Sequence, residues 1–303
     1  MGGDDEKRGR DEVEPTVVLS VVIPCRNGEA TLHELLEALA IQTWDEHWEV
    51  IVADNDSTDG SVGVVESFRD RLPGLRVVDA RGKSGPAHTM NVGAAAARGA
   101  FLAFCDCDDV VGEAWVSALG NALAVHPFVA AIQETARLNP EWLQRSRGGH
   151  GDRLPVTLFP PHIEYAGAGT IGIRKELHEL VGGFEEDIGA QFEIDYAFRL
   201  AERDVKPVLV PEAVLHYRWR TSLGANFRQG LWYARGRAVV ERRYRSQPPG
   251  ARELVRWPIA GWREISSLLL RSRDRGSRTR LAWVLGWQLG RYQAAVRERV
   301  WIR

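Results

Sequence analysis

The sequence predicts an α/β fold built on a doubly wound, mainly parallel sheet. Short apolar segments alternate with segments of helical period through the first third of the chain, the order expected of parallel strands joined by helices. Polar, carboxylate-rich turns follow several of the apolar segments, and ligands of open α/β sheets bind outside the carboxyl ends of the strands. The 303-residue chain is long enough for one such domain and an additional region.

The spacing of hydrophobic residues predicts the individual strands of this sheet and the helices between them. Apolar, β-branched runs predict strands, and the leucine spacing of residues 29–42 predicts a helix. Pro24 is expected to stop the first strand. The predicted strands span residues 17–24, 48–53, 75–79 and 101–104, and the predicted helices between them span residues 29–42, 61–72 and 87–98.

Three carboxylates follow the apolar run at residues 101–104. Asp106 and Asp108 are two positions apart, so on an extended chain their side chains point the same way. This arrangement of Asp106 and Asp108 suits a hard divalent cation, which takes oxygen ligands and commonly shares them with phosphates. A solvated acidic turn after a strand is the alternative, and this stretch alone does not decide between the two.

Two nucleotide-binding motifs are missing from the sequence. The loop at residues 81–86 lacks the Gly-x-x-x-x-Gly-Lys-Ser/Thr order of a P-loop, which argues against a nucleoside triphosphatase. No Gly-x-Gly-x-x-Gly follows the first strand, which argues against a dinucleotide-dependent oxidoreductase. The three cysteines form no paired framework and lack partners for a soft-metal site, so a reducing, cytoplasmic setting is expected.

Charge is strongly segregated along the chain. The formal net charge is −2, yet the segment from His216 to the end holds 20 Arg, no Lys and 5 acidic residues, a balance of +15, so the remainder carries −17. A basic region of this kind favours an anionic partner, such as membrane phospholipid, a lipid phosphate or a polyanionic acceptor. Pairing with the acidic body of the same protein, or of a second subunit, is the alternative.

Four sequence blocks, in the same order along the chain, resemble family 2 glycosyltransferases. They are Val21–Asn27 (VVIPCRN), Asp54–Ser61 (DNDSTDGS), Phe104–Asp109 (FCDCDD) and Val181–Asp187 (VGGFEED), the last followed by Phe192–Leu200 (FEIDYAFRL). The resemblance covers about residues 17–220. It implies a GT-A fold, a nucleotide-diphosphate sugar donor, Mn²⁺ or Mg²⁺, and inverting transfer to an acceptor hydroxyl of a glycan, a lipid-linked compound or a small molecule.

The same resemblance implies a set of site residues. A domain at residues 16–220 would divide into a donor half, 16–110, and an acceptor half, 111–220. The implied donor contacts are Pro24, Cys25, Arg26, Asn27, Asp54, Asn55, Lys83, Asn91, Asp106 and Cys107; the implied metal ligands are Asp106, Asp108 and His216; the implied acceptor-side residues are Gly167, Ala168, Gly169, Phe192, Arg199 and Tyr217.

The catalytic base is expected in the fourth block, where the sequence departs from the family. The family typically has Glu-Asp seven and six positions before an arginine, and counting back from Arg199 gives Phe192 and Glu193. Glu193 is therefore the expected general base, one methylene longer than the usual Asp, and Asp195 is the alternative. A structural carboxylate near a helix N-terminus is the simpler interpretation of either residue.

A second departure concerns the cation that would contact the diphosphate. The segment at residues 89–91 reads Thr-Met-Asn where the family usually has Ala-Arg-Asn. Met90 removes that positive charge, so Lys83 or a later arginine is expected to take its place.

The ends of the chain differ from its centre. Residues 1–15 are acidic and polar and are predicted to form a disordered leader. Residues 221–303 are rich in Arg and Trp and predict a helical extension, which would serve as a peripheral contact with the inner face of the membrane or as a homo-oligomer interface. Its last helix carries an apolar stripe at Leu281, Leu285, Leu289, Tyr292, Val296 and Val300, and such stripes more commonly pack on a core or a second subunit.

Two further function classes stay open on the sequence alone. Phe192 and Met90 are compatible with a binding or scaffold protein that keeps the fold but transfers no sugar. A sugar-phosphate nucleotidyltransferase would share the sheet and the metal carboxylates. The absence of a Gly-rich, basic loop directly after the first strand argues against it.

Overall fold

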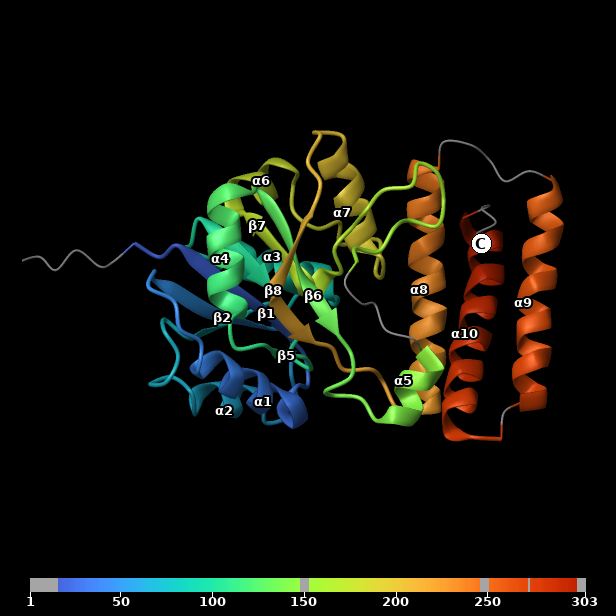
Figure 1. Ribbon diagram of the computed structural model, residues 1–303, viewed down its shortest axis with the longest axis horizontal. Coiled ribbons are helices and arrows are strands. Elements are labelled where there is room, and N and C mark those ends of the chain that lie inside the picture. The colour runs from blue at the N-terminus through green and yellow to red at the C-terminus, as the bar shows by residue number, and fades with distance from the viewer. Residues whose placement is uncertain (1–15, 148–152, 246–250, 272, 299–303) are drawn as a thin grey trace, which may run out of the picture.

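A computed structural model describes residues 16–147, 153–245, 251–271 and 273–298, and the predicted leader at residues 1–15 lies outside them. Within these residues one eight-stranded sheet has the order β3-β2-β1-β4-β7-β6-β8-β5 (Figure 1). Only β7 and β5 run against the other six strands. The predicted α/β fold with a doubly wound, mainly parallel sheet is confirmed.

The elements follow one another along the chain in the alternating order that the hydrophobic pattern indicates. The strands are β1 (Leu19–Cys25), β2 (Trp48–Asp54), β3 (Arg76–Asp79), β4 (Phe101–Phe104), β5 (Val110–Val111), β6 (Phe128–Glu134), β7 (Ile171–Arg174) and β8 (Val208–His216). The helices are α1 (Glu29–Ala40), α2 (Ser61–Glu66), α3 (Pro86–Ala96), α4 (Trp115–Val125), α5 (Glu141–Arg147), the 3₁₀ helix η1 (Ala168–Thr170), α6 (Lys175–Leu180), α7 (Phe192–Ala201), α8 (Leu223–Tyr244), α9 (Ala251–Arg271) and α10 (Arg275–Glu298).

Several predicted boundaries differ from the observed ones, and two of them, at the ends of β1 and α2, have a physical reason. Strand β1 continues through Pro24, which stands opposite Ala53 in the parallel ladder, and ends at Cys25. Helix α2 ends at Glu66 instead of Leu72, and tight turns fill the rest of that segment. In both places the packing of neighbouring elements overrides the local residue preference.

The sheet is covered on both faces because its strands alternate. Along β1, Val21 and Ile23 belong to the core beneath α1 and α4, and Val22 belongs to the core beneath α3, α6 and α7. Successive side chains of a strand point to opposite faces, so apolar runs without alternation are needed for a sheet buried on two sides. The two cores fix the carboxyl ends of β1, β2 and β4 at one edge.

Three long helices extend the sheet domain at one end. Figure 1 shows α8, α10 and α9 side by side, with α10 between the other two. Glycines allow close contact of α8 with α10: a Cβ on Gly230 would lie 2.3 Å from the Trp283 carbonyl oxygen, and one on Gly286 would lie 2.0 Å from the Phe227 carbonyl oxygen. The helical character predicted for residues 221–303 is confirmed for the described residues.

The apolar stripe predicted for the last helix does not face the core. Leu285, Leu289 and Val296 are exposed on α10, and Val300 lies outside the described residues. Helix α10 packs instead through its glycine side, because backbones approach most closely where no Cβ intervenes. In the described part of the chain, no helix combines the length and the apolar character required to cross a membrane.

Candidate active site

Three carboxylates meet between the end of β4 and the start of β5. One oxygen from each of Asp106, Asp108 and Asp109 lies within 4.8 Å of the others. Strand β4 is parallel to β1, so the cluster lies at the carboxyl edge of the sheet, where ligands of such sheets bind. We call Asp106, Asp108 and Asp109 the carboxylate cluster.

Burial makes the negative charge of the carboxylate cluster unfavourable. Burial, with the charge of Asp108 second, raises the pKa of Asp106 to about 7. Burial also raises the pKa of Asp108, against the opposing charge of Arg220. Burial and the charges of its two neighbours raise the pKa of Asp109. Crowded, poorly solvated acids of this kind favour a bound cation.

The carboxylate oxygens of the cluster suit a hard divalent cation as ligands. Oδ1 of Asp109 accepts a hydrogen bond of 2.8 Å from the Arg218 backbone N–H. Its buried Oδ2 has no hydrogen-bond partner within the described residues. Buried polar atoms are normally paired, and carboxylate oxygens are the ligands that Mg²⁺ and Mn²⁺ prefer. Asp106, Asp108 and Asp109 therefore fit such an ion.

A glycine permits the position of Asp106. A Cβ added to Gly169, in η1, would lie 3.1 Å from Oδ2 of Asp106, whereas a Cβ on Gly167 would meet only Thr170 Oγ1 at 3.7 Å. Among the expected acceptor-side residues Gly167, Ala168 and Gly169, the close backbone approach therefore lies at Gly169. It touches the carboxylate cluster directly.

The structure places His216 outside the carboxylate cluster. Its Nδ1 lies 2.6 Å from Oε2 of Glu134, because the two residues stand opposite each other on β8 and β6. Although burial opposes it, the hydrogen bond from His216 helps to lower the pKa of Glu134. Among the described residues, the group able to hold a metal contains the three aspartates and no histidine.

Glu193, in the first turn of α7, lies near the carboxylate cluster. Burial raises its pKa to about 7; the charge of Asp106 adds to this effect and Arg237 opposes it. Burial, with the charge of Glu193 second, raises the pKa values of Tyr165 and Tyr233. Helix α8 therefore brings Tyr233 and Arg237 to the same place as the predicted base.

Asp195, the alternative base, has its oxygens occupied by donors. Oδ2 accepts a hydrogen bond of 2.8 Å from Nε of Arg199, and Oδ1 accepts bonds of 2.6 Å from Arg243 and 2.8 Å from the Tyr244 hydroxyl. The side chain is fully buried. These contacts join α7 to α8, and they place Arg199, predicted on the acceptor side, in a structural ion pair.

The structure places Phe192 in the core beneath α3 and α7. Its side chain is buried and meets the ring of Phe184 edge-on, with 5.3 Å between the centroids. Phe192, expected on the acceptor side, thus gives its side chain to this core. The surroundings of this side chain are apolar, which explains why Phe can occupy the position where the family usually has Glu.

Hydrogen bonds join the loops that follow β1 and β2. Asn27 adopts a positive φ of 55°, and its Oδ1 accepts a hydrogen bond of 2.8 Å from the Thr58 backbone N–H. The Asn27 N–H donates in turn to Ser57 Oγ. Asp54 Oδ2 accepts from the Ser57 N–H at 3.3 Å, and its buried Oδ1 has no partner in the described residues. Asp54 therefore retains an oxygen for a ligand.

Two thiols lie beneath the first loop. A Cβ on Gly28 would lie 3.1 Å from Sγ of Cys25 and 3.2 Å from Sγ of Cys107. Their mutual hydrogen bond is the largest cause that lowers the pKa of Cys25 and raises that of Cys107. Pro24 and Cys25, two of the predicted donor contacts, are buried members of β1.

Asn55 and Lys83 shape the loop after β3. The Asn55 amide donates to the carbonyl oxygens of Ala80, at 2.5 Å, and Lys83, at 2.9 Å. The ammonium of Lys83 lies 2.7 Å from Asp187 and 3.1 Å from Glu186. The predicted diphosphate cation is therefore already paired with two carboxylates.

Arg26 and Asn91 also make intramolecular contacts. Arg26 donates to Ser84 Oγ at 2.7 Å and links the loops after β1 and β3. The Asn91 side chain forms two 2.8 Å hydrogen bonds with the backbone of Phe184. Asn91 thus anchors the segment that leads to α7.

Sequence analysis expected Lys83 or a later arginine near the diphosphate and did not single out Arg220. Arg220 is the cation whose charge opposes the burial effect at both Asp106 and Asp108. Tyr217, from the same segment, is half-buried beside the three aspartates, whose charges add to the burial that raises its pKa. The signal was present in the stretch HYRWR at residues 216–220, but spacing alone could not show which arginine turns toward the aspartates.

A family model and several curated proteins match the chain. The model described as Glycosyl transferase family 2 matches residues 20–181. Pre-mycofactocin glycosyltransferase of Mycobacterium tuberculosis is 30% identical over 214 residues, covering 68% of this chain and 43% of that protein. Poly(ribitol-phosphate) beta-N-acetylglucosaminyltransferase TarS of Staphylococcus aureus is 38% identical over 96 residues, covering 31% of this chain and 17% of that protein. The chain spans less than half of the length of these relatives.

Solved glycosyltransferase structures share the fold. The mannosyltransferase PcManGT of Pyrobaculum calidifontis, solved with GDP-Man and Mn²⁺, has a TM-score of 0.54 at 19% identity and covers 92% of this chain and 75% of that one. Residues 1–349 of S. aureus TarS have a TM-score of 0.50 at 17% identity, covering 95% of this chain and 93% of that one. At such identities the similarity establishes the architecture.

Proposed function

The chain belongs to glycosyltransferase family 2, and we propose that it transfers a sugar from a nucleotide-diphosphate donor to an acceptor hydroxyl. The transfer inverts the anomeric centre and depends on Mn²⁺ or Mg²⁺. Residues 16–110 form the donor half and residues 111–220 the acceptor half. The observation that carries this proposal is the meeting of three carboxylates at the carboxyl ends of the strands, with a fourth, half-buried carboxylate, Glu193, whose pKa the charge of Asp106 helps to raise.

The carboxylate cluster would hold the metal. Asp106, Asp108 and Asp109 supply oxygen ligands, and Oδ2 of Asp109 lacks a partner among the described residues. When bound, a divalent cation neutralises charge that develops on the leaving diphosphate. Arg220 supplies a second positive charge on this side, since Lys83 is paired with Asp187 and Glu186.

Glu193 acts as the general base. Its carboxylate removes the proton of the acceptor hydroxyl as that oxygen attacks the anomeric carbon, and the protonated carboxyl later returns the proton to water. A base is most effective when its pKa lies near the working pH, and burial brings that of Glu193 to about 7. Asp195 is unsuited to this role because Arg199, Arg243 and Tyr244 occupy its oxygens.

The ends of β1 and β2 bind the nucleotide. Asp54 offers an unpartnered buried oxygen, and the carbonyl oxygen of Asn55 can accept a hydrogen bond from a base while its amide holds the next loop. Asn27 fixes the relative position of the two loops. TarS has been solved with UDP-GlcNAc and PcManGT with GDP-Man, which supports a nucleotide-sugar donor and leaves the choice of base to experiment.

The position of Phe192 favours transfer over a scaffold role. Phe192, in place of the usual Glu, is compatible with a protein that binds the donor without transferring the sugar. Its aromatic ring lies in the core. It leaves Glu193 beside the site. A nucleotidyltransferase has no supporting observation in the described residues.

A thermal-stability screen tests donor and metal together. The full chain is heated with UDP- and GDP-sugars, each with and without Mn²⁺, because a ligand that binds only the native state raises Tm by mass action. We expect one donor class to raise Tm in the presence of Mn²⁺ and to lose this effect in Asp106→Ala. NMR of the product then reports the anomeric configuration. A Mn²⁺-dependent shift that persists in Asp106→Ala refutes the metal assignment, and no shift with any donor refutes the donor class.

A further inference from the structure

Helix α9 is the outermost element of the C-terminal region. It packs on α10, which separates it from α8 and the sheet domain (Figure 1). Ile265 is buried toward α10, and a Cβ on Gly261 would collide with the side chain of Gln288. One side of α9 is thus fixed to the protein, and the opposite side faces away from it.

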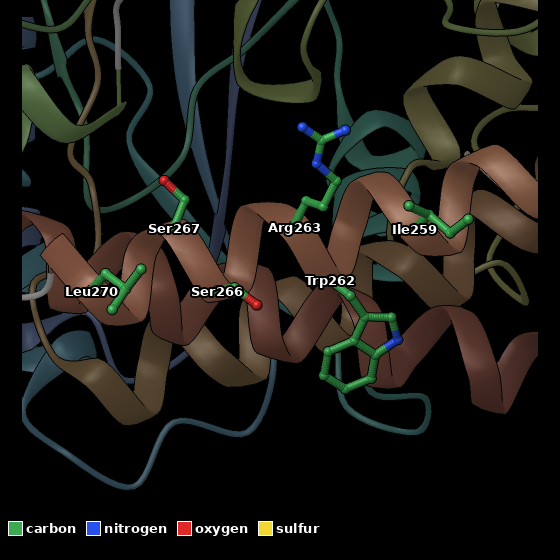
Figure 2. Close-up of a pocket in the computed structure, with 6 residues that line it drawn as sticks. All are labelled: Ile259, Trp262, Arg263, Ser266, Ser267 and Leu270. Carbon is green, nitrogen blue, oxygen red and sulfur yellow. The ribbon is translucent and has the colours of Figure 1, made fainter.

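The outward side of α9 is apolar and hollowed. Ile259 and Leu270 have exposed fractions of 54% and 82%, and Trp262, 52% exposed, flanks them while its indole N–H donates to the Tyr292 hydroxyl of α10 at 2.9 Å. They line a shallow pocket of about 580 Å³ together with Arg263, Ser266 and Ser267, as Figure 2 shows. The exposed Leu285, Leu289 and Val296 of α10 add to the apolar surface of this end of the molecule. Large contiguous apolar patches on a surface mark interaction sites.

Arginines accompany these apolar side chains. Positions 252, 256, 259, 263, 266 and 270 follow a spacing of three and four residues, so Arg252, Arg256 and Arg263 share one side of α9 with Ile259 and Leu270. All three arginines are exposed. The Glu264 carboxylate is bound to Arg280 at 3.0 Å. The outward side of α9 therefore combines bulky apolar groups with positive charge.

We propose that this side of α9 docks on an anionic phospholipid surface. Ile259, Trp262 and Leu270 would enter the boundary between headgroups and acyl chains, and Arg252, Arg256 and Arg263 would contact lipid phosphates. Helices with this arrangement lie in the plane of the interface, and each basic side chain near an anionic leaflet contributes about 1 kcal/mol.

Charge favours lipid over a second copy of the chain. The segment from His216 to the end carries +15, so two copies that met through the same side of α9 would bring like charges together. An anionic bilayer has the complementary charge. Because α10 and α8 lie between α9 and the active site, docking is expected to leave nucleotide-sugar binding unchanged.

Vesicle co-sedimentation with the full chain tests the proposal. Vesicles of phosphatidylcholine alone are compared with vesicles that also contain phosphatidylserine, at low and high salt. We expect binding to the anionic vesicles, weakened by salt and reduced about tenfold in Arg263→Glu, which reverses one charge. Leu270→Glu should reduce it at least as much, since it also removes apolar area.

Matched variants control for charge and apolar area. Ile41→Glu changes another exposed apolar residue, after α1, and Arg69→Glu reverses an exposed arginine after α2; both should bind vesicles as the unmodified chain does. Equal binding by Leu270→Glu and Ile41→Glu overturns the proposal, as does failure of the unmodified chain to bind anionic vesicles. A concentration-dependent dimer that Leu270→Glu abolishes, without vesicle binding, assigns the surface to a second copy and also overturns it.

Discussion

Acids at the two ends of the parallel strands, the amino edge and the carboxyl edge of the sheet, have pKa values shifted in opposite directions. At the amino edge, Glu49 near the start of β2 accepts hydrogen bonds from Ser20 and from the Arg98 backbone N–H and forms ion pairs with Arg76 and Arg98. Against the effect of burial, these partners lower its pKa to about 2. At the carboxyl edge, burial raises the pKa of Asp106 to about 7.

The difference separates stabilising carboxylates from functional ones. A buried charge with several donors stabilises the fold, whereas crowded buried charges are unfavourable until a ligand binds them. We infer that the amino edge contributes to stability and that the carboxyl edge gives up stability for the proposed metal binding. Substitutions at the carboxyl edge should therefore lower activity without lowering Tm. Substitutions at the amino edge should lower Tm without lowering activity.

Removal of Asp108 should have the largest effect on activity. We expect Asp108→Ala to lower metal-dependent transfer at least about a thousandfold, because the cation loses a ligand, while Tm stays the same or rises as like charges are separated. Calorimetric titration with Mn²⁺ and a transfer assay measure the two effects. Asp70→Ala, an exposed aspartate after α2, is the control, and full activity of Asp108→Ala would sink the metal assignment.

Removal of the proposed base should lower the rate and leave donor binding intact. Glu193→Gln is expected to reduce kcat about a hundredfold. The folded pKa of about 7 lies above the ordinary value near 4.5, so the carboxylate is available above pH 7 and the rate of the unmodified chain should fall as pH falls through 7. Steady-state kinetics across pH measure this limb.

Glu202→Gln, at the exposed end of α7, serves as the control for Glu193→Gln. An unchanged acidic limb of kcat in Glu193→Gln would show that another group is the base. Loss of donor binding in that variant would instead assign Glu193 to the donor site.

A substitution at the amino edge should affect stability alone. We expect Glu49→Gln to lower the free energy of unfolding by about 2 kcal/mol, less than the full pKa difference implies because Arg76 and Arg98 are partly exposed. Because the folded pKa is depressed to about 2 from 4.5, this stability is present above pH 4.5 and is lost as pH falls toward 2. Urea unfolding at several pH values measures it.

Glu46→Gln, an exposed residue just before β2, should leave the urea midpoint unchanged. A midpoint for Glu49→Gln equal to that of the unmodified chain would show that the two edges do not differ as described.

The smallest expected effect is at Gly169. A methyl group would stand 3.1 Å from Oδ2 of Asp106, so Gly169→Ala should displace that oxygen slightly and weaken Mn²⁺ binding about tenfold, or about 1.4 kcal/mol. Gly167→Ala meets only Thr170 Oγ1 at 3.7 Å and should bind as before. Calorimetry compares the two variants, and equal affinities would contradict a close approach at Gly169.

Much of the fold could be predicted because its strands are buried on two sides. Uninterrupted apolar runs and a leucine stripe identified β1 to β4 and α1, and the polar turns after β1, β2 and β4 located the ligand-binding edge. The length of α2 and the outward stripe of α10 could not be predicted. Both depend on neighbouring elements: turns end α2, and glycine contacts with α8 select the opposite side of α10.

By itself the sequence determined the α/β class, the family blocks and two of the three clustered aspartates, because period and spacing are local properties of the chain. Only the tertiary structure showed that Asp109 belongs to the cluster and that Arg220 is the cation beside it. It also showed that His216 pairs with Glu134, and that Asp195 pairs with Arg199 whereas Glu193 does not. The physical reason is that a carboxylate's role depends on its partners. Donors from Arg199, Arg243 and Tyr244, distant in sequence, occupy Asp195, while Glu193, two positions away, is left beside the carboxylate cluster.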